Sequence, residues 1–341
     1  MKDLLVVGGG PAGLATALYA ARAGLDVTVW DKRAGTIDKA CGEGLMPGAI
    51  TALESLAVKP EGHDLVGIRY VAGRRSVEAP FRNGVGRGVR RTTLHDALRD
   101  AALDAGVPLE QRSAASVVPS ADSVLVDGSR FRHVVAADGL HSPVRRMLGL
   151  DGRAAAYRRF GLRRHYGVTP WTSYVEVHWS PAGEAYVTPV APDLVGVAML
   201  TATKGSFEER LASFPALEAR LTETDPDGET MGAGPLLQRA RSRVAGRVLL
   251  VGDAGGYVDA LTGEGISLAV AQARAAVGAI VDGDPGRYER DWHSVTRRYR
   301  LLTAGLLGAT RVGPARRALV PTAERLPAVF SAAVNALARP A

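Results

Sequence analysis

The stretch from Leu4 to Gly13, LLVVGGGPAG, constrains the fold of this chain more than any other. Its four apolar residues predict a short buried strand, and Leu14 to Ala23 has the character of a helix. Between them Gly8, Gly10 and Gly13 follow the spacing G-x-G-x-x-G. The first glycine permits a tight turn, the second lets backbone approach a pyrophosphate, and the third lets the helix pack closely on the strand. The free N–H groups and positive dipole end of the helix N-terminus favour phosphate. The segment therefore predicts a dinucleotide-binding unit.

An acidic residue after the next predicted strand supports this interpretation. The strand covers Asp26 to Trp30, and Asp31 lies 18 residues after Gly13. A carboxylate about 20 residues after the glycines accepts hydrogen bonds from ribose hydroxyls. The residues that we expect to hold this end of the dinucleotide are Gly8, Gly10, Pro11, Ala12, Gly13, Asp31, Lys32 and Arg33.

Length and composition limit the class of protein. With 341 residues, 46% apolar and 23% charged, the chain can form two domains of ordinary size. The net charge of +7 comes without a basic tract interleaved with aromatic residues, so we expect no nucleic-acid partner. One cysteine excludes an internal disulfide, and seven scattered histidines predict no metal site. The glycines interrupt the apolar N-terminus, which argues against a signal peptide, and no run approaches the ~20 apolar residues of a membrane span. We expect a cytoplasmic protein.

The loop after Asp31 holds the only cysteine, in the sequence Cys41-Gly42-Glu43-Gly44. Its glycines indicate tight turns or a close approach of backbone to a flat group. A short helix is predicted from Gly48 to Leu56, and a helix is predicted to start near Thr92, with Arg91 just before it. At that position Arg91 is either a solvated side chain beside a cap or a group that reaches a phosphate or the cofactor.

The chain changes character after residue 156. Alternating runs between Tyr157 and Leu200 predict an antiparallel sheet, and Phe207 to Leu221 predicts one amphipathic helix. We expect two intercalated domains. The cofactor domain comprises residues 1–64, 86–155 and 241–285, the substrate domain comprises a hairpin in 65–85 together with 156–240, and residues 286–341 form a helical cap.

Two later segments carry turn motifs typical of nucleotide sites. An apolar strand ends in Asp138-Gly139, and Ser142 and Arg145 follow with the spacing D-G-x-x-S-x-x-R, which also fits a simple strand-to-helix turn with caps. Further on, a buried strand ends in Gly252-Asp253, and Gly263-Glu264-Gly265 opens a long helix. The N-terminus of that helix favours negative charge.

The C-terminal part, from Tyr288, is helical and basic. We interpret its arginines as the solvated face of the helical cap. The alternative is contact with anionic lipid or an acidic carrier protein. These arginines are Arg297, Arg298, Arg300, Arg311, Arg316 and Arg317.

Taken together, the three separated motifs resemble the FAD-binding set of the p-hydroxybenzoate-hydroxylase fold group. Within it, Gly252-Asp253-Ala254 with Thr262-Gly263-Glu264-Gly265-Ile266, and the early Cys41-Gly42-Glu43-Gly44, are most similar to the geranylgeranyl-reductase family. The resemblance covers nearly the whole chain. It implies an α/β fold: a Rossmann-like FAD-binding domain with a parallel sheet, an antiparallel β-sheet substrate domain and C-terminal helices. It also implies FAD as cofactor, with NAD(P)H as the electron donor.

The resemblance also assigns roles to residues. It implies that Arg91 reaches the cofactor, Asp253 the ribityl chain, and Gly263 to Ile266 the pyrimidine edge of the flavin, with Cys41 beside the ring. The full set of further cofactor contacts that we expect is Cys41, Gly42, Arg91, Asp138, Gly252, Asp253, Gly263, Glu264, Gly265 and Ile266.

For catalysis, Cys41 and Glu43 are candidate proton donors, and each also has a structural interpretation as a packed turn residue or a capping carboxylate. Met46, Tyr186, Thr188 and Pro189 are candidate substrate contacts, and core packing explains the last three equally well.

Three functions fit these residues. The first is hydride transfer from reduced flavin to a C=C bond of an apolar small molecule, either an isoprenoid or a secondary metabolite. The second is an NAD(P)H- and O2-dependent monooxygenase of secondary metabolism, which hydroxylates or epoxidises its substrate. The third is a non-redox cyclase that retains FAD. The strand around Tyr186 lacks the tryptophan that is usual in geranylgeranyl reductases, and the W-x-W-x-I-P segment of flavin halogenases is missing.

Overall fold

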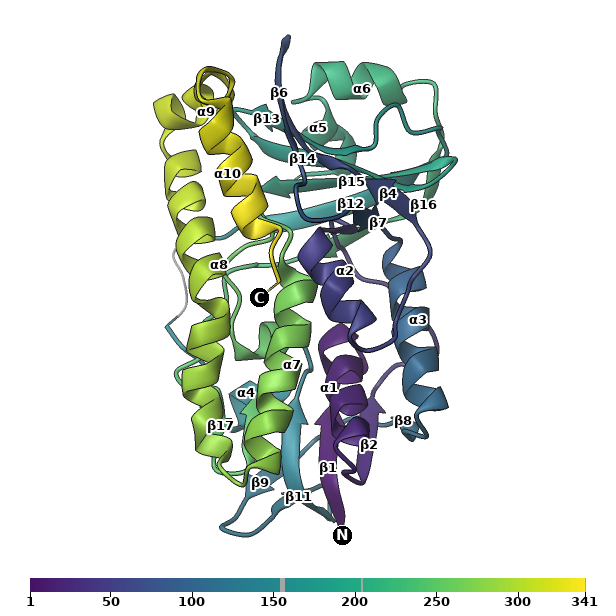
Figure 1. Cartoon of the computed structure of the whole chain (residues 1–341), viewed down its shortest axis with the longest axis vertical. Helices are drawn as coiled ribbons and strands as arrows, with labels where there is room; N and C mark the ends of the chain where they lie inside the picture. The colour runs from purple at the N-terminus through teal and green to yellow at the C-terminus, as the bar shows by residue number, and fades with distance from the viewer. Residues whose placement is uncertain (154–156, 204, 341) are drawn as a thin grey trace.

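An eight-stranded, largely parallel sheet forms one end of the molecule (Figure 1). The structure is a computed structural model that describes residues 1–153, 157–203 and 205–340. The β18, β11, β1, β2 and β8 strands run parallel, β17 and β10 add antiparallel partners, and β9 pairs with β10. In spatial order the main path is β17 (Val244–Ala245), β18 (Val248–Leu250), β11 (Ser129–Ala136), β1 (Lys2–Val7), β2 (Val27–Asp31) and β8 (Leu109–Gln111), with β10 (Val124–Val126) and β9 (Val117–Pro119) beside β11.

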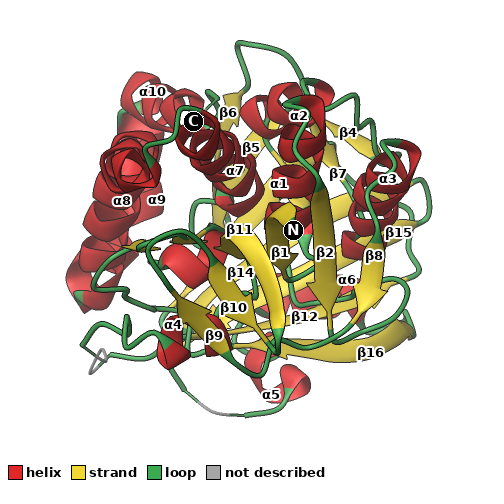
Figure 2. Cartoon of the chain, turned by 90° about the horizontal axis from the view of Figure 1, so that it is seen from below, coloured by secondary structure: helices red, strands yellow, loops and turns green. Residues whose placement is uncertain are grey.

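Three helices cover one face of this sheet: α1 (Pro11–Arg22), α3 (Arg91–Asp104) and α7 (Gly265–Val281). Alternate residues of β1 explain the two layers. Leu4 and Val6 are buried against these helices, whereas Leu5 and Val7 are buried on the opposite face with β9 and β10. Figure 2 shows the helices and the β9–β10 hairpin on the two sides of the sheet. The α2 helix (Pro47–Glu54) packs on α7, and α4 (Pro143–Met147) follows β11.

A seven-stranded sheet lies at the other end of the molecule (Figure 1). All its pairings are antiparallel except β5 with β13, which run parallel. Its strands, in spatial order, are β16 (Pro226–Ala233), β12 (Phe160–Tyr166), β15 (Leu194–Thr201), β14 (Gly183–Ala191), β13 (Tyr174–Ser180), β5 (Gly67–Ala72) and β6 (Arg75–Pro80).

Small elements join the two sheets. A three-stranded sheet of β3 (Gly44–Leu45), β7 (Gly86–Gly88) and β4 (His63–Leu65) holds the loop that carries the cysteine. Single-turn 3-10 helices form at η1 (Gly252–Gly255) and η2 (Pro285–Arg287).

Of the three C-terminal helices, α8 (Tyr288–Arg311) runs from one sheet to the other, and α9 (Gly313–Arg325) and α10 (Pro327–Leu337) lie beside the seven-stranded sheet (Figure 1). The α8 helix packs along α7, while α9 and α10 pack against β6. In the part of the chain that the structure describes, no helix combines the length and apolarity needed to cross a membrane.

The expected fold class is confirmed by these two sheets and the C-terminal helices. One element differs from expectation. The single helix predicted for Phe207 to Leu221 is two short helices, α5 (Phe207–Leu211) and α6 (Pro215–Leu221). Pro215 has no backbone N–H and disfavours helical geometry at Phe214, so the first helix ends before it.

Candidate active site: a cavity between the two sheets

The glycine turn after β1 is shaped by two close backbone contacts. Gly8 has φ +111°, and a Cβ there would lie 2.4 Å from the Ala137 carbonyl oxygen. A Cβ on Gly13 would lie 1.8 Å from the Gly8 carbonyl oxygen. Gly10 differs, because no atom lies within 4 Å of the position of its missing Cβ. The outer two glycines thus allow packing of α1 on the sheet, and the middle one leaves backbone open at the start of the helix.

Asp31, the last residue of β2, lies beside the glycine turn. Its carboxylate accepts hydrogen bonds from the Gly9 amide, at 2.8 Å, and from the Arg33 guanidinium, at 3.0 and 3.1 Å. Burial raises the pKa of Asp31, but the hydrogen bonds from Arg33 and Gly9 outweigh it and hold that pKa below its usual value. Asp31 is therefore ionised at neutral pH and fixes the glycine turn. The Lys32 and Arg33 side chains line the adjoining cavity.

A cavity of about 620 Å³ extends from this turn to the seven-stranded sheet. Its cofactor-side walls come from separate segments of the chain, which the eight-stranded sheet brings to one edge. Of the expected cofactor contacts, those lining it are Gly10, Pro11, Ala12, Lys32, Arg33, Cys41, Gly42, Arg91, Asp138, Gly252, Asp253, Gly263, Gly265 and Ile266.

Buried polar atoms around this cavity lack partners within the described chain. They include Nη1 of Arg91 and Oδ1 of Asp138. Burial raises the pKa values of Asp138 and Asp253, and nearby Lys39, Arg91 and Arg145 partly offset this at Asp253. Buried polar groups are normally hydrogen-bonded. A cofactor with phosphates and several hydroxyl groups supplies the missing partners, so the residues fit FAD.

Arg145, the last residue of the D-G-x-x-S-x-x-R motif, fixes the backbone next to Asp138 and Asp253. Its buried guanidinium donates to the carbonyl oxygens of Ala254 at 3.0 Å and Leu140 at 3.1 Å, and to Asp151 at 2.7 Å. Ser142 caps α4 by accepting from the Arg145 amide. The motif thus holds the β11 turn against η1.

Among Gly263 to Ile266, Glu264 is the one residue that does not line the cavity in the described structure. It points instead toward α8, where Oε1 lies 3.9 Å from Nη2 of Arg298, and its Oε2 is buried without a hydrogen-bond partner among the described residues. Burial raises the pKa of Glu264 to about 7, against the smaller opposing effects of Arg298 and Thr262. Its neighbours Gly263 and Gly265 line the cavity.

The far end of the cavity is apolar. Its walls come from the seven-stranded sheet, from the loop before α7 and from the C-terminal helices, and they include Ile68, Tyr70, Val177, Met199, Leu200, Leu261 and Val334. Of the predicted substrate contacts, Met46 and Tyr186 line this cavity, and the Tyr186 hydroxyl donates to the Leu261 carbonyl at 2.9 Å.

The other two predicted substrate contacts, Thr188 and Pro189, do not line the cavity in the part of the chain that the structure describes. The Thr188 hydroxyl donates to the Gly42 carbonyl at 2.8 Å, and the Pro189 carbonyl packs against Gly88. Thr188 thus supports the cysteine loop, whereas Pro189 packs on β7.

The cysteine loop positions both candidate proton donors at the cavity. Glu43 has φ 59°, an uncommon conformation for a residue with a side chain, and is only 3% exposed. Its Oε1 accepts from the Arg91 amide at 2.8 Å, and its Oε2 lies 2.7 Å from Nε2 of His165. Burial, together with the charge of Glu43, raises the pKa of the Cys41 thiol. Cys41 therefore keeps its proton at neutral pH.

His165 and Arg163 were not anticipated from the sequence. Both project from one face of β12 toward Glu43, with Arg163 Nε at 3.8 Å from Oε1. Their separation by two residues in an alternating strand places them on the same face, which is the only sequence signal that could have paired them.

Comparisons with known proteins agree with this site. The family model described as FAD dependent oxidoreductase matches residues 3–84. The menaquinone reductase of Mycolicibacterium smegmatis is 31% identical over 87% of this chain and 80% of its own length. The digeranylgeranylglycerophospholipid reductase 1 of Methanothermobacter thermautotrophicus is 29% identical over 84% of this chain and 81% of its own.

Solved structures show the same fold at lower identity. A geranylgeranyl bacteriochlorophyll reductase-like protein from Thermoplasma acidophilum superposes with a TM-score of 0.77 at 21% identity, covering 99% of this chain and 96% of that one. The flavin-dependent brominase Bmp2 superposes with a TM-score of 0.81 at 15% identity, covering 99% and 93%.

The fold and the site thus define an FAD-dependent oxidoreductase. Within that class, the chain belongs to the geranylgeranyl-reductase-like family, as the sequence resemblance predicted.

Proposed function

We propose that this protein reduces a C=C bond of an apolar small molecule, with an isoprenoid chain as the favoured substrate class and NAD(P)H as the source of electrons. One observation carries the proposal. The polar cofactor half of the cavity continues into an apolar half lined by residues such as Tyr70, Val177 and Leu200, and a thiol that keeps its proton borders it. The relatives named as reductases of menaquinone and of digeranylgeranylglycerophospholipid support the reaction type, and they leave this chain's own substrate open.

Saturating an isolated double bond requires a hydride at one carbon and a proton at the other. Bound FAD in its reduced form supplies the hydride. The chain supplies the rest. Arg91, Asp138 and Asp253 hold the cofactor, the apolar wall orients the substrate and excludes water, and Cys41 holds a proton at Sγ.

Cys41 is better suited to donate that proton than Glu43. Both Glu43 oxygens are engaged, one by the Arg91 amide and one by His165. The Glu43 amide also donates to Cys41 Sγ at 3.4 Å, which fixes the thiol. In this arrangement Glu43 and His165 position the loop, and Cys41 gives its proton to the carbon that does not receive the hydride.

The test is anaerobic single turnover of the reduced holoprotein, freed of excess dithionite, with a digeranylgeranyl lipid, which has no redox-active ring. We expect a product that gains two hydrogens at a C=C bond of the isoprenoid chain. Cys41→Ala should slow this step by about 10²-fold or more, the usual contribution of a general acid, while bound flavin is retained. Cys41→Ser keeps a group of similar size and separates loss of the proton donor from loss of packing.

Two outcomes would count against the proposal. A product that forms only with O2 and contains an added oxygen would establish the monooxygenase. The absence of the usual tryptophan from the strand around Tyr186 is the observation that favours that second function. Reduction at the wild-type rate by Cys41→Ala would remove Cys41 from the mechanism.

A further inference from the structure

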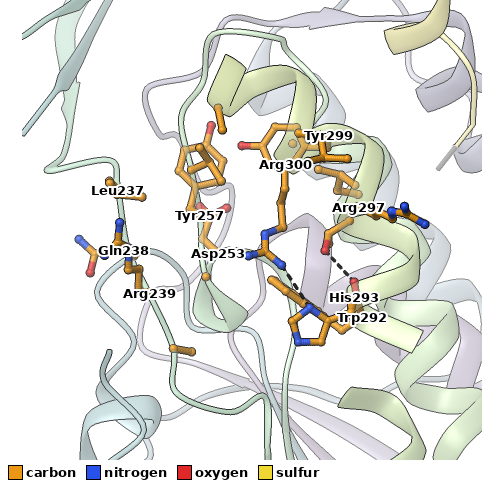
Figure 3. A pocket seen from close by; sticks show the side chains of 18 of the residues that line it. Leu237, Gln238, Arg239, Asp253, Tyr257, Trp292, His293, Arg297, Tyr299 and Arg300 are labelled. Atoms are coloured by element: carbon orange, nitrogen blue, oxygen red, sulfur yellow. Dashed lines mark hydrogen bonds between the residues drawn. The ribbon is translucent and has the colours of Figure 1, made fainter. Parts of the chain in front are cut away.

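A second cavity, of about 780 Å³, opens beside the cofactor cavity (Figure 3). One wall is the segment from Leu237 to Ala240, and the other is the face of α8 that carries Trp292, His293 and Arg300. Tyr257 and Asp253 lie between the two walls. We call this space the α8 cleft.

Positive charge dominates the α8 cleft. Five arginines and one histidine line it against a single carboxylate, Asp253. Only Arg243 has an acidic partner, Glu289, at 2.9 Å; the other four arginines have no carboxylate within 4 Å among the described residues. Those four are Arg239, Arg297, Arg300 and Arg311.

Arg300 lies close to a second arginine and to a histidine in the α8 cleft. Its guanidinium lies 5.3 Å from the Trp292 ring, on which Arg243 also packs at 3.8 Å, and its Nη1 is 3.1 Å from Nδ1 of His293. Burial lowers the pKa of Arg300, and the charge of Arg243 lowers it further. With two guanidinium groups on one indole ring, this part of the α8 cleft is positively charged and favours an anion.

The α8 cleft shares a wall with the cofactor cavity. Gly252, Asp253, Tyr257 and Gly265 line both spaces. Beyond the basic cluster the cleft becomes apolar, where Leu301, Ala304 and Leu307 of α8 line it. A ligand seated there combines an anionic group with a less polar part, and it lies against the segments that hold the flavin end of the site.

We propose that the α8 cleft binds a phosphorylated small molecule that takes part in the same reaction, with its negative charge attracted by the arginines of the two walls, Arg239 and Arg300. Several guanidinium groups around one site match the multiple charges and oxygens of phosphate better than those of a single carboxylate. Two sources share this chemistry: the pyridine dinucleotide electron donor and the phosphorylated head group of a lipid substrate. The assignment of either ligand to the reaction rests on the proposed function, whereas the binding site does not.

The experiment is a binding titration of oxidised holoprotein, which needs no turnover. One arm uses NADP⁺, and the other uses a soluble prenyl diphosphate. Binding is followed by calorimetry and by the fluorescence change expected of Trp292. The variant is Arg239→Gln/Arg300→Gln, which changes two exposed side chains. Arg317→Gln on α9, exposed and outside the α8 cleft, is the control for lost charge.

We expect saturable binding in one arm, weakened about tenfold or more in the double variant and unchanged in Arg317→Gln, with flavin content equal in all three proteins. Added salt should weaken binding to the wild type more than to the double variant. The arm that binds identifies the source of the phosphate.

Absence of binding in both arms, or equal affinity of wild type and double variant, would overturn the site. If binding is lost in the double variant while no alkene is reduced under any condition, the α8 cleft stands and the proposed reaction falls.

Discussion

Glu264 makes the stability of this protein depend on pH in a predictable direction. Its side chain is buried beside α8, and burial raises its pKa from 4.5 to about 7. In the unfolded chain the group ionises near its ordinary value. Between these two values the folded state therefore binds more protons than the unfolded state, and stability falls as pH rises.

The magnitude follows from the difference between the two pKa values. One pKa unit corresponds to about 1.4 kcal/mol, so ionisation of buried Glu264 costs about 3 kcal/mol once the pH exceeds about 7. Below about pH 4.5 that cost is absent. Glu264→Gln keeps the shape of the side chain and cannot ionise, so it should gain stability relative to wild type as the pH rises.

The assay is urea unfolding of both holoproteins at about pH 5 and about pH 8. We expect the free energy of unfolding of Glu264→Gln, relative to wild type, to increase by about 2 to 3 kcal/mol between these conditions. Comparison within each pH removes the contribution of Glu184, whose pKa is also about 7. Glu61→Gln, at an exposed site, is the control. A stability difference that stays constant across the pH range would refute the reasoning.

Three further predictions concern the cavity. Gly13→Ala places a Cβ 1.8 Å from the Gly8 carbonyl and should abolish FAD retention in purified protein; Gly305→Ala, on the exposed side of α8 with no atom within 4 Å, should retain full flavin absorbance. Leu200→Trp should fill part of the apolar end of the cavity, so that turnover of long-chain alkenes falls more than turnover of short ones while FAD stays bound. Tyr186→Phe removes the hydrogen bond to Leu261 and should cost about 1 kcal/mol in thermal or urea unfolding; an unchanged stability would show that this bond contributes nothing.

Local patterns explain what the sequence predicted well. The strand, glycine turn and helix around Gly8 to Gly13 are contiguous, as are Gly252-Asp253 and the segment that opens α7, so short-range rules were sufficient to locate the cofactor side of the cavity. Parallel strands then bring these turns to one edge of the sheet.

Side-chain direction was harder to predict. Glu264 lies in the flavin-side segment but points to Arg298, and Thr188 lies on the strand of Tyr186 but supports the cysteine loop. The direction of each side chain depends on which hydrogen-bonding or charged partner a neighbouring element provides. The position of a residue in a motif does not reveal that partner.

Contacts between residues far apart in the chain could not be predicted from the sequence. His165 meets Glu43 across 122 residues, because β12 is placed beside the cysteine loop only after the seven-stranded sheet forms. Arg297, Arg300 and Arg311 of α8 are exposed, in line with a solvated face. Nothing in the sequence indicates that they share a cleft with Arg239, which lies on a distant loop.

The proposed function requires that the reduced flavin of this protein transfer its electrons to a carbon–carbon double bond. The most direct measurement is rapid mixing of the reduced holoprotein, freed of excess dithionite, with a digeranylgeranyl lipid in the complete absence of oxygen, with the flavin absorbance followed over time. We expect the alkene alone to reoxidise the flavin in a single turnover, with the amount of flavin reoxidised equal to the amount of saturated product formed. A flavin that stays reduced with every alkene, yet is reoxidised by oxygen with an oxygenated product, would contradict it.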